Sequence, residues 1–131
     1  MILQSESDKR IIVSGTINGK KAYMLVDTGA SCGLFHKKIA KSYKITTSQH
    51  KVNLVGAGGS FTAYVSNTPF LLADKPIYQF VVSDISDVVN SIKRQTGIEI
   101  AGVIGLNQMK MMGISIDTDD NYIEIGGKEL G

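Results

Sequence analysis

The chain has 131 residues, of which 43% are hydrophobic, and its 14 basic and 12 acidic residues leave a net charge of only +2. A hydrophobic content this high excludes a disordered chain, and the balanced charge gives no reason to expect a nucleic-acid or membrane partner. The length fits a single domain over residues 1–131.

Cysteine usage and the termini favour a soluble protein. Cys32 is the only cysteine, so no disulfide can form within the chain. The first ten residues, MILQSESDKR, hold no apolar run long enough for a signal peptide, and no stretch approaches the roughly 18 apolar residues of a membrane span. We therefore expect a cytoplasmic location, although a chain cut from a longer protein would have the same features.

The first predicted elements are two strands. Residues 10–17 and 20–26 are rich in β-branched and apolar side chains, and Asn18 and Gly19 between them favour a tight hairpin turn. The sequence DTGAS follows, and its composition does not continue a strand.

A short helical segment and a second hairpin come next. Residues 35–43 predict one or two helical turns. Residues 50–55 and 61–65 predict two strands, joined by the glycine-rich link GAGGS at residues 56–60. Three glycines in five residues indicate a tip that is mobile, strained or closely approached.

The middle of the chain predicts two more strands and a helix. The strands fall within residues 69–84, with a turn at Asp74, Lys75 and Pro76. In the helix, apolar residues recur at helical spacing, Ser83 or Asp84 can cap the start, and Gly97 ends it. The spaced apolar residues are Ile85, Val88, Val89 and Ile92.

The last part of the chain predicts a strand, a helix and a hairpin. Residues 100–105 form a short buried strand, and residues 106–112 form a short helix that ends at Gly113. Residues 114–125 form a hairpin with Asp119, Asp120 and Asn121 in its turn. The sum is a mainly β chain of many short strands.

Asp27 is the candidate catalytic residue. A carboxyl group directly after an apolar run costs free energy unless something nearby satisfies or uses it. Peptide hydrolysis without a metal, Ser or Cys needs one group to activate water and another to protonate the leaving amine. Two adjacent carboxyls do both by sharing a proton. The chain has one such motif, so a symmetric homodimer would supply the second carboxyl.

The ordered motifs resemble those of retropepsin-like aspartic proteases. The run LVDTGAS, residues 25–31, is similar to the active-site loop of that family, and the glycine-rich hairpin at residues 52–65 lies where the family has its substrate-covering flap. The run AGVIGLNQMKMMGISID, residues 101–117, is similar to the family's second apolar-apolar-Gly element with its helix and strand. The match covers about residues 10–126.

This resemblance implies a fold and an activity. The fold would be a closed, antiparallel, barrel-like acid protease (retropepsin) fold with one or two short helices. The activity would be endopeptidase cleavage of an extended polypeptide by a homodimer, with no metal or cofactor. The alternative is a catalytically silent dimerisation or peptide-binding module that keeps the fold.

The resemblance also implies roles for single residues. Asp27 would be the catalytic carboxyl, and Thr28 would hydrogen-bond across the dimer axis. Support for the active site would come from Thr28, Gly29, Ala30, Ser31 and Gly105. The flap and substrate-binding residues would be Val55, Gly56, Ala57, Gly58, Gly59, Ser60, Phe61, Val103 and Ile104.

Three features refine what the resemblance implies. Ala30 has no hydroxyl to donate to the catalytic carboxylate, and such a bond would favour the charged form, so we expect activity at mildly acidic to near-neutral pH. Leu106 stands where many retroviral proteases have an Arg that supports the dimer. The segment from Ser83 to Glu99 is longer than in the compact viral enzymes, as in cellular or bacterial members.

Simpler interpretations compete with each motif. Asp27 before a Gly is also typical of a turn cap, and GAGGS of an ordinary hairpin loop. The glycines of GAGGS do not open a helix, which argues against a nucleotide site. The run DTDDN at residues 117–121 resembles the start of a calcium loop but has Tyr122 where that motif needs Gly. A thiol dyad of Cys32 and His36 has no supporting residue.

Overall fold

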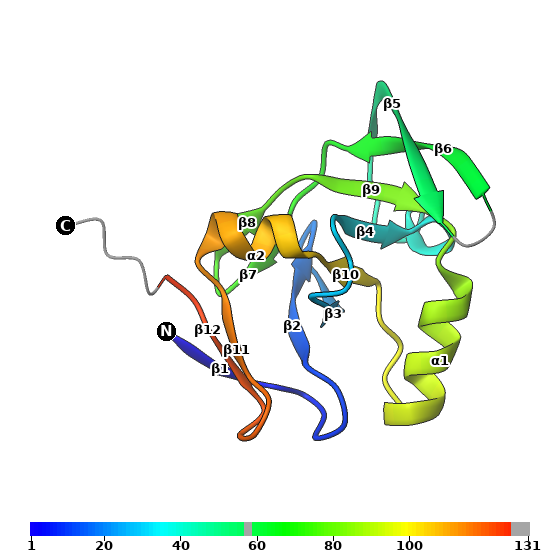
Figure 1. The fold of residues 1–131 in the computed structure, drawn as a ribbon. Helices are drawn as coiled ribbons and strands as arrows, with labels where there is room; N and C mark the ends of the chain where they lie inside the picture. The colour runs from blue at the N-terminus through cyan, green and yellow to red at the C-terminus, as the bar shows by residue number, and fades with distance from the viewer. Residues whose placement is uncertain (57–58, 127–131) are drawn as a thin grey trace.

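The computed structural model describes residues 1–56 and 59–126, with only the backbone described at 54–56 and 59–61. Within this part the protein is mainly β and is built around a nine-stranded sheet (Figure 1). In pairing order, its strands are β5 (Thr47–Gly56), β6 (Gly59–Ser66), β9 (Phe80–Ser83), β4 (Gly33–His36), β10 (Gly102–Ile104), β3 (Lys20–Val26), β2 (Ile12–Ile17), β7 (Phe70–Leu72) and β8 (Lys75–Ile77).

The predicted hairpin of β2 and β3 is confirmed. Asn18 and Gly19 join the two strands with φ values of 51° and 80°, and Asn and Gly are the residues that tolerate such backbone angles best. Asn18 Nδ2 also donates to the carbonyls of Tyr43 and Lys44, at 2.8 and 3.0 Å. The hairpin tip is therefore tied to the segment that follows β4.

The centre of the sheet comes from the far end of the chain. β10 pairs in parallel with β3, with Val103 opposite Leu25, and antiparallel with β4 on its other side. All three residues of β10 are buried, as expected for a strand with neighbours on both sides and both faces covered. β9 then pairs in parallel with β4. The sheet is thus mixed rather than purely antiparallel.

β5 and β6 form a long hairpin that projects from the sheet, with the pairs Val55–Ser60 and Gly56–Gly59 near its end. β6 connects the hairpin to β9. Ala57 and Gly58, which we expected at the tip, lie outside the described residues.

The segment from residue 69 to 84 forms three strands rather than the two that we expected. The turn between β7 and β8 lies at Ala73 and Asp74, which have φ values of 50° and 65°. Lys75 and Pro76 belong to β8 instead. Proline is tolerated there because β8 is an edge strand whose outer amides need no partner.

The described residues also form two α-helices and a short 3-10 helix, η1 (Lys37–Ile39). α1 (Ser86–Thr96) ends at Gly97 and α2 (Leu106–Met112) ends at Gly113, each glycine in the left-handed region. The residue at the N-cap position of α1 is Ile85 rather than Ser83 or Asp84. Asp84 still contributes, because its Oδ1 accepts a hydrogen bond of 2.9 Å from the Ser86 amide.

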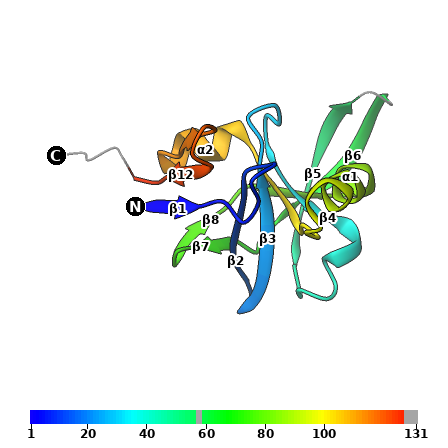
Figure 2. The same ribbon diagram turned by 90° about the horizontal axis from the view of Figure 1, so that it is seen from below.

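The terminal segments form a separate three-stranded sheet of β1 (Ile2–Gln4), β12 (Tyr122–Glu124) and β11 (Ser115–Asp117). β12 and β11 are the predicted hairpin, whereas β1 was not predicted. β1 pairs with β12 of its own chain, with Leu3 opposite Ile123. This sheet and the β5–β6 hairpin lie at opposite ends of the molecule in both ribbon views (Figure 2).

The core has two parts because successive strand residues point to opposite faces. In β3, Met24 and Val26 pack in the larger cluster, which includes the stacked rings of Phe35 and Phe80, with centroids 4.0 Å apart. Leu25 packs in the smaller cluster under α1. α1 contributes Val89 and Ile92 to it, and Ile85 before the helix joins them, as predicted. Val88, the fourth residue of the predicted apolar face, is instead exposed.

The expected barrel closure is not confirmed. In the described part of the chain, the large sheet runs from β5 to β8 without a pairing between these two end strands. No helix among the described residues is long and apolar enough to cross a bilayer.

Candidate active site

Asp27 is the first residue after β3, and β10 fixes its backbone. The Asp27 amide donates to the Ile104 carbonyl at 3.1 Å, which continues the parallel pairing of the two strands by one residue. The Asp27 side chain is half-buried, while Thr28 and Gly29 are exposed. The apolar run therefore delivers a carboxyl group to the surface at a rigid position.

The loop after Asp27 folds back onto the carboxyl group. The Gly29 amide donates to Asp27 Oδ1 at 2.8 Å, and the Ala30 amide donates to the Asp27 carbonyl at 3.2 Å. A Cβ atom on Gly29 would lie 3.1 Å from the same Oδ1, so a side chain would crowd the carboxylate. Glycine allows the short amide–carboxylate bond that fixes the side chain of Asp27.

The start of α2 holds the other end of this loop. The Leu106 amide donates to the Ala30 carbonyl at 2.8 Å, and the Asn107 amide donates to the Ser31 carbonyl at 3.3 Å. Gly105 precedes these donors, and a Cβ atom there would lie 2.4 Å from the Cys32 carbonyl carbon. The backbone of the loop passes so close to Gly105 that no residue with a side chain fits at this position.

Gln108 supports this arrangement, and the sequence reasoning missed it. Its side chain is 1% exposed; its Oε1 accepts from the Gly105 amide at 2.9 Å and its Nε2 donates to the Tyr78 carbonyl at 2.7 Å. It fills the space beside Gly33, where a Cβ atom would meet Oε1 at 2.2 Å. A Gln at the third position of a helix is a known sign of this bond to the preceding backbone.

The structure brings Asp27 and the residues predicted to support it together. Asp27, Thr28, Gly29, Ala30 and Ser31 form one loop, and Gly105 packs directly behind it. The residues expected in the flap, Val55, Gly56, Gly59, Ser60 and Phe61, lie on the β5–β6 hairpin.

Val103 and Ile104 have a different position from the one we expected. We expected them to line the substrate site, but they are 3% and 0% exposed. Their side chains pack in the two core clusters because β10 is covered on both faces. They support the Asp27 loop from behind.

Two cavities open beside Asp27. One, of about 360 Å³, is also lined by Thr28, Arg10 and two residues from the β11 region, Ile116 and Thr118. The other, of about 300 Å³, lies between Asp27 and α1. The carboxylates of Asp8 and Asp87 line one cavity each, and in the described part of the chain neither has a hydrogen bond to Asp27.

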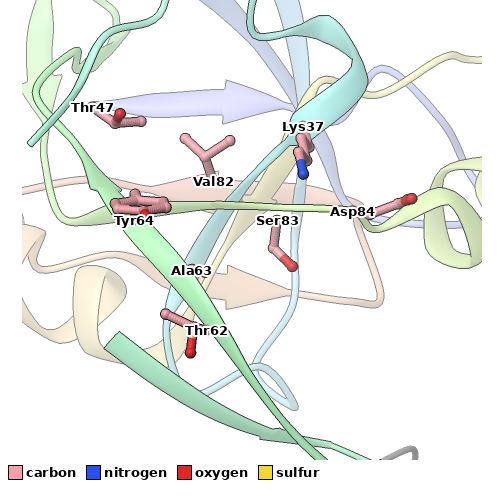
Figure 3. Close-up of a pocket in the computed structure, with 8 residues that line it drawn as sticks. All are labelled: Lys37, Thr47, Thr62, Ala63, Tyr64, Val82, Ser83 and Asp84. Carbon is pink, nitrogen blue, oxygen red and sulfur yellow. The ribbon is translucent and has the colours of Figure 1, made fainter. Parts of the chain in front are cut away.

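A larger cavity, of about 520 Å³, lies at the base of the β5–β6 hairpin (Figure 3). Its lining comes from β5, β6, β9 and the residues next to β4, and Figure 3 shows Val82 and Ser83 on opposite sides of β9. None of its lining residues belongs to the predicted site. It therefore gives no support for catalysis at that position.

Comparisons with known proteins agree with this geometry. A family model described as aspartyl protease matches residues 13–107, which include all of β2 but its first residue, together with β3, the Asp27 loop and β10. Among solved structures, EIAV protease complexed with the inhibitor HBY-793 is similar, with a TM-score of 0.60 and 16% sequence identity over 88% of this chain and 99% of that chain. None of the curated proteins searched matches the sequence.

Proposed function

Because this chain belongs to the aspartyl protease family and has a retropepsin-like fold, we propose that it is an aspartic endopeptidase in which Asp27 is the catalytic carboxyl. The observation that carries this proposal is the Asp27 loop. A half-buried carboxylate that accepts a hydrogen bond from the Gly29 amide, in a loop held from behind by β10 and α2, is kept in one orientation. Fixed orientation is what a catalytic group needs.

We further propose that the active form is a homodimer over the single domain of residues 1–131. One carboxyl group cannot both accept the proton of the attacking water and polarise the scissile carbonyl. A two-fold axis beside Asp27 would place a second copy opposite the first, and the two would share one proton. The face to be covered includes Thr28 and Ile116, which line a cavity with Asp27.

The reaction then follows from the paired carboxyls. The ionised carboxylate takes a proton from water as the water oxygen attacks the scissile carbonyl carbon. The protonated partner donates its hydrogen to the carbonyl oxygen and later accepts it back, while the leaving amine takes the other proton. The β5–β6 hairpin would cover an extended polypeptide, and Thr28 would bridge the two loops.

The test compares the wild type with Asp27→Asn on a diverse peptide library, with sedimentation of both proteins. We expect cleavage by the wild type and a loss of at least about a thousandfold in the variant, because the amide cannot act as a base. Equal cleavage by both would exclude an aspartic protease. A folded wild-type dimer that binds peptides without cleaving them would favour the silent peptide-binding module.

A further inference from the structure

The cavity of about 300 Å³ beside Asp27 is built largely by α1. Asp87, Val88, Ser91 and Ile92 line it, together with Leu25 and Arg10. The four residues from α1 are separated by one, three or four positions, which places them on one face of the helix. The helix that packs on the sheet therefore also forms a wall next to the catalytic carboxyl.

The cavity has an apolar floor and a charged rim. Leu25 and Ile92 are both 1% exposed and form part of the core, so they give the cavity a fixed apolar base. Val88 stands on the same helix at 38% exposure, which is high for a large apolar side chain. Arg10 and Asp87 bring one positive and one negative charge.

Arg10 is held in place by α1. Its Nη1 donates to Gln95 Oε1 at 3.1 Å, and Gln95 Nε2 in turn lies 3.5 Å from Ser91 Oγ. Across the residues that the structure describes, neither Arg10 nor Asp87 takes part in an ion pair. Both charges thus remain available to a group that enters the cavity.

We propose that this cavity binds the substrate side chain next to the scissile bond and that Val88 and Asp87 determine which side chain is accepted. The proposal rests on the proposed function. Asp27 itself lines the cavity, so its occupant lies beside the bond that is attacked. The apolar floor suits an uncharged side chain of medium size, such as Leu or Met. A charged side chain of either sign meets a rim group of like charge and loses its hydration.

The test measures which peptides are cleaved when the residues flanking the bond are varied. Val88→Ala enlarges the cavity and should raise the preference for Phe over Leu about tenfold. Val88→Phe narrows the cavity and should shift the preference about tenfold toward smaller side chains. Apolar pockets discriminate side-chain size by about such factors. Asp87→Lys makes both rim charges positive. Cleavage of peptides with Asp or Glu next to the scissile bond should therefore rise about tenfold relative to cleavage of peptides with Leu there.

The matched control is Asn90→Lys. It adds the same side chain to the same helix, at an exposed position outside the cavity, and should leave the profile unchanged. Melting temperatures of all variants show that α1 is intact. Binding of the same peptides to Asp27→Asn gives the preference without cleavage, so the pocket is tested even if no cleavage occurs.

Each outcome separates the two proposals. Unchanged preferences in the Val88 and Asp87 variants, while Asp27→Asn is inactive and the wild type active, would overturn the pocket and leave the protease intact. Full activity of Asp27→Asn would overturn the protease itself. Loss of all cleavage in folded Asp87→Lys would make Asp87 part of the catalytic machinery and overturn its role in selection.

Discussion

Gly105 lies against the backbone of the Asp27 loop, with no room for a side chain. The Cys32 backbone would lie 2.4 Å from a Cβ atom at this position, and backbone cannot move aside as a side chain can. We expect Gly105→Ala to lower the free energy of unfolding by at least about 2 kcal/mol, as overpacking does. Urea unfolding measures this loss. Met111→Ala, at an exposed position of α2, is the control, with an expected change within about 0.5 kcal/mol.

Ala30 is the residue that sets the expected pH range. Its amide donates to the Asp27 carbonyl and its side chain packs against the smaller core cluster, so it lies in the Asp27 loop without a polar side-chain group. In Ala30→Ser, a hydroxyl that donates to the carboxylate would favour the charged form. We expect the profile of kcat/KM against pH to move to lower pH by roughly half a unit or more.

The neighbouring hydroxyl provides the control for this experiment. Ser31 is exposed, and Ser31→Ala should leave the pH profile in place. A wild-type optimum near pH 3, or identical profiles for the wild type and Ala30→Ser, would contradict the expectation.

At the scale of the element, α1 begins with a charged hydrogen-bond acceptor. Asp84 accepts hydrogen bonds from the Ser86 hydroxyl and amide, and these bonds lower the pKa of Asp84 below its ordinary value. A lowered pKa means that the ionised group stabilises the fold above its ordinary pKa of 3.8, and that this contribution is lost as the pH falls through the lowered value.

Asp84→Asn tests that contribution. The amide oxygen can still accept hydrogen bonds but carries no charge. We expect the variant to melt below the wild type at pH 7 and the difference to shrink as the pH falls from about 4 through the lowered pKa of Asp84, because the wild-type carboxylate becomes protonated over that range. Melting temperatures from pH 2 to 8 measure it. A difference that stays constant across this range would show that the charge plays no part.

The elements also show which parts of the structure were predictable. The β2–β3 hairpin, α1 and α2 follow from local signals, namely the Asn18 turn, helical spacing and the stops at Gly97 and Gly113. The position of β10 between β3 and β4 does not follow from local signals, because hydrogen bonds between distant residues decide it. β1 escaped prediction for the same reason.

The candidate site was predictable to a similar extent. Asp27 and its loop are contiguous in sequence, so the motif was visible. Gln108 and Arg10 were not, since the first acts through its contact with Tyr78 and the second through Gln95. The burial of Val103 and Ile104 also depends on strands far along the chain.

At the scale of the whole molecule, shared catalysis predicts interference between copies. If each dimer needs two Asp27 carboxyls, a heterodimer of the wild type with Asp27→Asn has one and is inactive. Adding an equal amount of the variant to a wild-type sample and letting the subunits exchange should reduce the total activity to about half, because random pairing leaves half of the original number of wild-type homodimers. A tenfold excess should nearly abolish it.

The mixing experiment has its own control. A variant that carries both Asp27→Asn and Gly105→Ala is added at the same protein concentration. If this double variant does not fold, it cannot pair with the wild type and should not suppress activity. If added Asp27→Asn does not change the activity of the wild type at any ratio, the catalytic unit is a monomer.

The insertion of β10 between β3 and β4 also has a consequence for biosynthesis. Asp27 leaves the ribosome early, but the Ile104 carbonyl and the Leu106 amide that hold its loop are made about eighty residues later. Pairings this distant in sequence form late because they close a long loop of chain. The nascent chain thus carries the Asp27 carboxyl group in a loop without its supporting hydrogen bonds for most of translation. The proposed protease would therefore be unable to cleave other proteins until its own synthesis is nearly finished.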